Sequence, residues 1–303
     1  MKTVLPVLVV VAVLVVVWYV AAIFLNAPFQ LDSYSRNSVT NWGWTKFLAD
    51  VWSQDRPSLP APHQVLAEFW KSTATVAVNS KRSLVYHAWV TLSATLLGFV
   101  FGTVLGIVLA VLIVHNDASD RSLMPWIIAS QAVPILAIAP IVVVVMYNVL
   151  TGDNLLAQTL DLDGDAAHLI SKALVSTYLS FFPVVVGMVK GFRSPEAIQL
   201  DLLRTYNAAA PKVFWKLRWP IAIPYLFTSM KVAVAASLVG AIVGELPTGA
   251  VAGIGSRLLT GSYYGQTTQI WAALLMGALL AGFLIFIVGL VERVVNWRMG
   301  ARA

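Results

Sequence analysis

Few residues of this sequence have types that do chemistry, and those that stand out lie inside or at the ends of long apolar stretches. Gln131 and Glu245 are each flanked by mostly apolar residues. Ionisable and amide side chains at membrane depth are rare and often mark a solute pathway, so both are candidate pathway residues. The alternatives are an interfacial carboxylate for Glu245 and a hydrogen bond to a neighbouring helix for Gln131. Lys231 also lies inside an apolar run, from which its long side chain can snorkel to the headgroups.

Motifs for catalysis and metal binding fail at their defining positions. The run from Asp161 to Asp165 resembles the start of a calcium loop, but Lys172 stands where the loop requires a bidentate Glu. The sequence has no H-E-x-x-H and no G-x-x-x-x-G-K-[ST], so neither a metalloprotease nor a phosphate-binding loop is supported. It also has no cysteine, which excludes disulfides and thiolate sites. We therefore expect no catalytic residue, no metal and no cofactor.

The composition is typical of a membrane protein. Of 303 residues, 59% are hydrophobic and 11% are charged, with a mean hydropathy of +0.80. A soluble domain usually carries about 25% charged residues. The 20 Lys and Arg gather in short segments between apolar runs, which favours a lipid bilayer over nucleic acid as the partner.

Six apolar segments approach the length of about 20 residues that a helix needs to cross a bilayer. They cover residues 4–25, 90–114, 124–150, 173–189, 221–244 and 270–291. We expect an all-α membrane protein with about six transmembrane helices. The first segment is too long for the apolar part of a signal peptide, roughly 7–15 residues. The fourth is short and contains Pro183, so a re-entrant segment is its alternative.

Loop charges predict the orientation. The loop from Lys190 to Arg218 is rich in Lys and Arg, whereas the loop from Thr151 to His168 has several Asp and neither Lys nor Arg. By the positive-inside rule the basic loop is cytoplasmic, and both termini then lie in the cytoplasm. The predicted parts are a transmembrane helix at 1–25, an external Trp-rich segment with a surface helix at 26–82, and a core of five transmembrane helices at 83–303.

Small residues recur at intervals of four in two of the apolar segments. They are Ala94, Gly98, Gly102, Gly106 and Ala110, and then Ala236, Gly240 and Gly244. Such faces let helix backbones approach closely, either as static packing or as a seam of a moving bundle. The third segment is broken in character, because Pro134 and Pro140 each free a carbonyl that needs another partner.

The basic loop is the most informative part of the sequence. Ser194 followed by a proline and an acid predicts a helix start, and Asn207 tolerates the left-handed conformation of a helix end. A second short stretch, 211–219, leads to Pro220, so we expect two short helices at an angle. Ile198, Leu202, Leu203 and Tyr206 form an apolar stripe. It can enter a partner's groove or lie on the chain's own bundle or on lipid headgroups.

This loop resembles the "EAA" loop of permeases from binding-protein-dependent ABC importers. That signature reads Glu-Ala-Ala, three residues, Gly, nine residues, Ile, one residue, Leu-Pro. Asp201, Leu202 and Leu203 take its first three places, with Asn207, Leu217 and Pro220 at the spacing of the Gly, the Ile and the final proline. The resemblance implies that residues 191–220 form the coupling loop to an ATPase. The implied contact residues are Asp201, Leu202, Leu203, Arg204, Tyr206, Asn207, Ala208, Phe214, Leu217 and Pro220.

The resemblance extends from about Leu59 to the C-terminus and is closest to the nitrate/sulfonate/taurine branch. Its further elements are Leu59-Pro-Ala-Pro, Thr91-Leu92, the segment 131–140, and Pro220 with Pro224-Tyr225. It implies a type I importer fold in a bacterial inner membrane, with two permease chains, two ATPase subunits and a periplasmic binding protein. Nitrate, a sulfonate, taurine, bicarbonate or a pyrimidine precursor would all be consistent substrates. The alternatives are a non-transporting scaffold and an ion-coupled secondary transporter, which would usually show inverted repeats and more buried ionisable groups.

Overall fold

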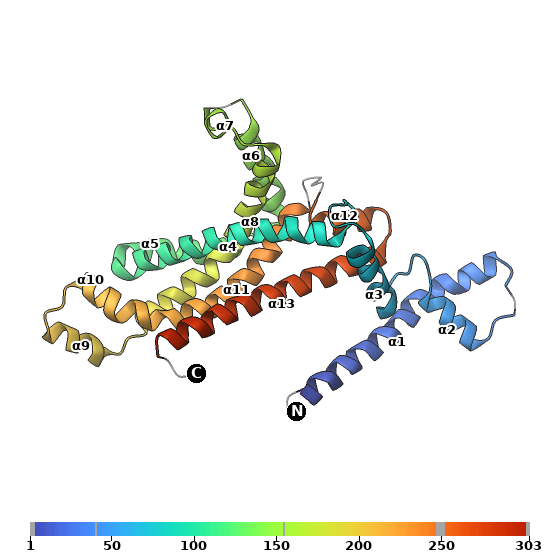
Figure 1. Ribbon diagram of the computed structural model, residues 1–303, viewed down its shortest axis with the longest axis horizontal. Helices are drawn as coiled ribbons and strands as arrows, with labels where there is room; N and C mark the ends of the chain where they lie inside the picture. Colours follow the sequence, from blue (N-terminus) through green and yellow to red (C-terminus); the bar gives the residue numbers. More distant parts are fainter. Residues whose placement is uncertain (1–3, 40, 154, 247–251, 301–303) are drawn as a thin grey trace. The chain divides into compact units, whose positions relative to one another are not determined.

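The computed structural model describes residues 4–39, 41–153, 155–246 and 252–300, and this part of the chain is built from helices and turns without strands (Figure 1). The chain divides into two compact units. The first comprises residues 1–88 and 256–277, and the second comprises residues 89–255 and 278–303. The all-α prediction is confirmed.

Five helices are long and apolar enough to cross a membrane. They are α1 (Val4–Arg36), α4 (Leu84–His115), α8 (Gly164–Arg193), α11 (Trp219–Glu245) and α13 (Thr267–Arg298). The span that contains α11 begins earlier, at Ala210. The pair α5 (Asp117–Ser130) and α6 (Ile135–Thr151), bent by 100°, makes a sixth span if its two parts cross together. The prediction of about six spans is confirmed.

The remaining helices are short. They are α2 (Trp44–Trp52), α3 (Pro62–Trp70), α7 (Leu155–Leu160), α9 (Ala197–Thr205), α10 (Ala210–Val213) and α12 (Ile254–Tyr263). Wider π turns occur at Lys71–Thr75 and Phe214–Arg218.

Helix α8 corrects the expectation of a short fourth segment. It begins at Gly164, where the Asp163 carboxylate accepts a hydrogen bond of 2.8 Å from the Ala166 amide and so caps the first turn. The acidic run therefore has a structural role as a helix start. Pro183 lies inside α8 without ending it, because the apolar part of this helix is packed against neighbours on several sides.

The small residues of α4 and α11 are packed against α8. A Cβ added at Gly98, Gly102 or Gly106 of α4 would overlap Ser176, Ser180 or Val184 of α8, respectively. Gly240 of α11 lies against the backbone of Val175 and Ser176.

Hydrogen bonds reinforce this packing. The hydroxyl of Ser176 on α8 lies 2.8 Å from that of Ser237 on α11, which donates to the Thr95 carbonyl of α4 at 2.8 Å. Both predicted stripes are thus packing faces that meet on α8.

In the first unit, α1 continues past residue 25, the predicted end of the first helix, to Arg36. The chain then folds back along it. The Asn26 side chain is fully buried, donating to the Leu59 carbonyl at 2.8 Å and accepting from the Leu59 amide at 3.1 Å. The Trp18 indole donates to the Pro60 carbonyl at 3.0 Å. Residues after α1 therefore form a packed body on this helix.

Replacing Gly102 with Val should destabilise the second unit, because the added side chain would occupy the position of the Ser180 hydroxyl. Overpacking of this kind costs about 1–3 kcal/mol. The thermal unfolding midpoint of the purified protein in detergent should fall by several degrees. Gly282→Val on α13 is the matched control, since nothing lies within 4 Å of a Cβ there. Equal losses in both variants would contradict a close seam at Gly102.

Candidate functional site

The first helix of the basic segment between α8 and α11 is α9, which starts later than predicted. The Ser194 hydroxyl donates to the Gly191 carbonyl at 2.7 Å and so serves the end of α8. Glu196 is the N-cap residue of α9, and its amide donates to the Gln199 side chain at 3.1 Å. The prediction of a helix start at Ser194 was therefore wrong, because this hydroxyl caps the preceding helix.

The end of α9 has the conformation that the sequence predicts. Asn207 has φ of 47°, in the left-handed region. Its amide donates to the Arg204 carbonyl at 2.8 Å, and the Ala208 amide donates to the Leu203 carbonyl at 3.0 Å. These two bonds form a Schellman motif, which turns the chain sharply away from the helix axis.

The second predicted short helix is instead continuous with the membrane helix. Helix α10 passes through the π turn at Phe214–Arg218 into α11, and the Trp219 amide donates to the Phe214 carbonyl. Pro220 has no amide hydrogen, and its ring would clash with the carbonyl of Lys216 in a regular helix. A wider turn at this place accommodates the proline.

Helix α9 presents its apolar stripe to the outside. Figure 1 shows α9 beyond the ends of α8 and α11, and none of its residues is buried. The exposed fractions are 72% for Ile198, 57% for Leu202 and 75% for Tyr206, and Leu203 is half-buried. The stripe is therefore available to a partner. Asp201 and Arg204 form an exposed ion pair of 3.1 Å beside it.

Phe214 does not share this exposure. It is buried, with its ring centroid 5.2 Å from that of Phe192 and 5.0 Å from that of His115. Its side chain belongs to the chain's own core, whereas the resemblance implied a contact residue. Leu217 and Ala208 are half-buried, and Pro220 is exposed.

Gln131 lies in a sharp bend between α5 and α6, here named the elbow and defined as residues 131–134. Pro134 lacks the amide that a continuing helix would direct at the Ser130 carbonyl, and the hydroxyl of Tyr178 on α8 donates to that carbonyl instead. Gln131 is exposed, and its amide contacts the Ser130 hydroxyl at 3.4 Å. Among the described residues, the alternative of a bond from Gln131 to a neighbouring helix is not realised.

The elbow leaves backbone polar groups without partners. Among the described residues, nothing bonds to the carbonyls of Gln131, Ala132 and Val133 or to the amides of Ile135 and Leu136. Unpaired backbone groups of this kind cannot face hydrocarbon, so at membrane depth they must face water or another protein.

Glu245, a candidate pathway residue, is the centre of a buried polar cluster, so the alternative of an interfacial carboxylate does not hold. The side chain is fully buried. It accepts hydrogen bonds from the Thr91 hydroxyl at 2.9 and 3.0 Å and from the Gly255 amide at 2.9 Å. The Lys172 ammonium lies 3.8 Å away and donates to the Ala252 carbonyl at 3.1 Å. One carboxylate therefore joins α4, α8, α11 and the start of α12.

Lys231 makes a second ion pair between membrane helices. Its ammonium contacts the Glu292 carboxylate of α13, and its stem lies near Gly289. The half-exposed lysine is therefore paired with a carboxylate of another helix. The sequence analysis had not selected Lys172 or Glu292 as partners, because pairing between distant helices leaves no local pattern.

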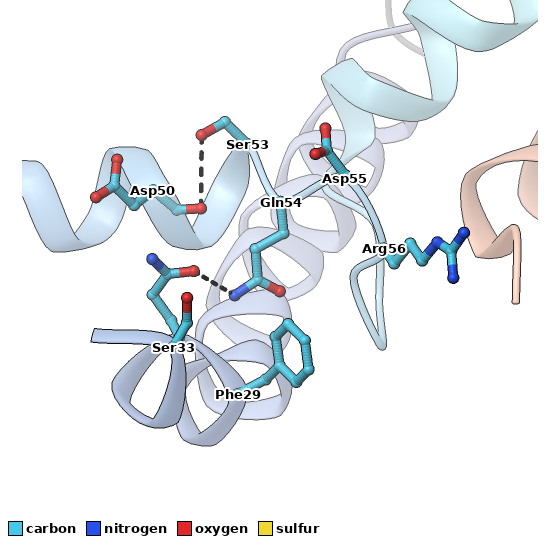
Figure 2. A pocket seen from close by; sticks show the side chains of 8 residues that line it. Phe29, Ser33, Asp50, Ser53, Gln54, Asp55 and Arg56 are labelled. Atoms are coloured by element: carbon cyan, nitrogen blue, oxygen red, sulfur yellow. Dashed lines mark hydrogen bonds between the residues drawn. The ribbon is translucent and has the colours of Figure 1, made fainter. Parts of the chain in front are cut away.

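A polar cleft of about 490 Å³ lies in the first unit, lined by Phe29, Gln30, Ser33, Asp50, Ser53, Gln54, Asp55 and Arg56. Figure 2 shows that Asp50, Asp55 and Arg56 point in different directions, so the cleft has no convergent set of charges. In the part of the chain that the structure describes, no group of three His, Asp or Glu could hold a metal.

Comparison with known proteins connects these features to transport. Residues 102–301 match the family described as binding-protein-dependent transport system inner membrane component. The formylaminopyrimidine transport permease ThiX of Halalkalibacterium halodurans is 29% identical over 62% of this chain and 64% of its own. The riboflavin transport permease RibX of Chloroflexus aurantiacus is 28% identical over 79% of this chain and 80% of its own.

A further relative and a solved structure extend the comparison. The putative aliphatic sulfonates permease SsuC of Bacillus subtilis is 22% identical over 70% of each chain. A chain of the inward-facing MetNI methionine ABC transporter matches with a TM-score of 0.56 and 17% identity, over 70% of this chain and 95% of its own. The predicted type I importer fold and the predicted branch are confirmed.

The buried pair of Lys172 and Glu245 predicts strong energetic coupling. Lys172→Met or Glu245→Gln alone should destabilise the protein by about 3–5 kcal/mol, because each leaves the other charge buried without its partner. The free energy of unfolding of the double variant should fall by clearly less than the sum of the two single decreases. Thermal unfolding of the four proteins in detergent measures this cycle. Additive losses would mean that the two groups do not interact.

Proposed function

The chain belongs to the family of inner-membrane components of binding-protein-dependent transport systems, and on this premise we propose that it is a permease subunit that couples solute import to an ATPase through α9. The observation that carries the proposal is the exposed apolar stripe of Ile198, Leu202 and Tyr206. An amphipathic helix of this kind docks with its apolar face in a partner's groove.

The attachment of α9 to the membrane helices suits it for transmitting motion. One end follows α8 directly, with Ser194 at the junction, and the other end is the Schellman motif at Asn207. A groove that grips α9 therefore acts on α8 at one end and on α10 and α11 at the other. Of the residues implied by the resemblance, Leu202 and Tyr206 are the proposed anchors. Asp201, Leu203, Arg204 and Asn207 flank them, and Phe214 stabilises the base.

The pathway is proposed to pass the elbow. Its unpaired carbonyls and the exposed Gln131 amide provide polar groups for water or solute. A single chain leaves this surface open, and a second permease copy or a homologue would enclose it.

Glu245 is enclosed by Thr91, Gly255 and Lys172. Its proposed role is accordingly to hold helices together.

The remaining parts of the assembly follow from the family. The chain would lie in a bacterial inner membrane with both termini in the cytoplasm, ATPase subunits on the side of α9, and a periplasmic binding protein on the other side. It would carry out no catalysis itself. Formylaminopyrimidine, riboflavin and aliphatic sulfonates are named for its relatives, which supports a small polar solute without selecting one.

Leu202→Asp should release the ATPase subunits from the permease. A carboxylate without a partner in an apolar groove costs several kcal/mol, enough to weaken attachment at least about a hundredfold. The measurement is the amount of ATPase that co-purifies with the tagged permease from membranes in which both are present. Leu155→Asp on α7 is the matched control, since Leu155 is also exposed, at 83%, and should retain the ATPase.

If Leu202→Asp retains its ATPase and transports normally, α9 is only a solvated connection. Solute accumulation that a protonophore abolishes and ATP depletion does not affect would favour an ion-coupled secondary transporter instead.

The absence of native cysteine allows a direct test of orientation. Thr205→Cys at the end of α9 should react with an impermeant thiol reagent only after lysis of spheroplasts, because the basic segment is proposed to be cytoplasmic. Asp153→Cys between α6 and α7 should react in intact spheroplasts. Labelling is measured by mass shift, and the reverse pattern would refute the proposed topology.

A further inference from the structure

Helix α5 is fastened to α8 at both ends. Near its start, the Asp120 carboxylate pairs with Arg193 at 2.7 Å, at the last residue of α8. At its end, the Ser130 carbonyl accepts from the Tyr178 hydroxyl. Helix α5 therefore spans α8 from the base of α9 to the elbow.

The contact of Tyr178 lies near the midpoint of α8. Tyr178 is 14 residues from Gly164 and 15 from Arg193 at the two ends of α8 (178 − 164 and 193 − 178). At about 1.5 Å of rise per residue, each end is roughly 21–23 Å away. A membrane crossed by α8 would surround this midpoint with hydrocarbon, which supplies no hydrogen bonds.

The Tyr178 hydroxyl is the main donor to the Ser130 carbonyl. Pro134 cannot supply the amide of a continuing helix, and the Val133 amide reaches this carbonyl only at 3.4 Å. A cleft of about 350 Å³ beside Tyr178 is lined by residues of α4, α6 and α8 that are apolar apart from Thr177 and Tyr178 itself. A hydrogen bond in such surroundings is favourable, because the alternative is an unpaired carbonyl.

We propose that Tyr178 is a positioning residue of the translocation pathway. Its hydroxyl ties the elbow to the midpoint of α8, so a displacement of α8 carries the elbow with it. This inference rests on the proposed function, in which the ATPase acts on α9 at the end of α8. The Asp120–Arg193 pair is partly exposed and contributes less to this tie, because solvent screens it.

The test uses Val133→Cys in the elbow, in the permease co-purified with its ATPase subunits and reconstituted in liposomes. The probe is a charged, membrane-impermeant methanethiosulfonate present on both sides of the membrane, and the rate of modification is measured without nucleotide and after trapping with ATP and vanadate. With Tyr178 intact, we expect this rate to change at least about fivefold between the two states.

Tyr178→Phe should abolish the difference while the ATPase stays bound and hydrolyses ATP. The matched control is Tyr225→Phe on α11, whose hydroxyl has no partner among the described residues and which should leave the difference intact. Incorporation of 4-aminophenylalanine at position 178 restores a donor and should restore the difference. This rescue separates the hydrogen bond from the mere presence of the ring.

Two results would overturn the inference. One is a Tyr178→Phe protein that keeps the nucleotide-dependent difference, and the other is a cysteine at position 133 that reacts in neither state with Tyr178 present. Loss of the ATPase from the parent protein is a separate result, because it would refute the proposed function before any reagent is added.

Discussion

The close approach of α4 and α11 to α8 is the contact on which the second unit depends. Because Gly98 and Gly102 carry no side chain, the hydroxyls of Ser176 and Ser180 fit against the backbone of α4. Lipid offers no hydrophobic driving force for helix association, so packing and interhelical hydrogen bonds must supply it. The hydroxyls along this seam supply both, and α8 is thereby fixed along much of its length.

The position of α8 in turn determines which polar groups can meet. Lys172 lies two turns from the start of α8 and reaches both Glu245 and the Ala252 carbonyl. Tyr178 reaches the elbow from the middle of the same helix, and Arg193 reaches Asp120 from its end. These contacts lie at successive depths along one rigid element. The proposed coupling segment, α9, begins directly after α8. The ATPase and the pathway would therefore both act through α8.

How much the sequence predicts depends on whether a feature is local. The close packing of helices along the glycine faces and the left-handed conformation of Asn207 were predicted correctly, since each follows from residue types within one element. The start of α9 was misplaced because a serine hydroxyl caps either the helix that ends or the one that begins. The first helix was predicted to end at residue 25, yet α1 continues to Arg36, and the Asn26 side chain within it bonds the distant Leu59.

Contacts between residues of different helices were not predicted. The burial of Phe214 comes from rings on α4 and α8, and nothing in the basic loop indicates them. Lys172 was considered only as a failed calcium ligand, and Glu292 was not considered at all. The break at Pro134 was predicted, whereas the donor that satisfies it lies 48 residues away on another helix. Such contacts become visible only when the helices are placed together.

The pairing of charges bears on how transport is powered. A carboxylate that exchanges an ion with water needs an open coordination position, and the oxygens of Glu245 are occupied by Thr91, Gly255 and the nearby Lys172. Removing one partner would leave the other charge buried, which supports the proposed role of this cluster in holding the helices together. Glu292 is likewise engaged, by Lys231. With these two acids paired between helices, we propose that the energy for moving solute enters at a surface that is free to bind, the exposed stripe of α9.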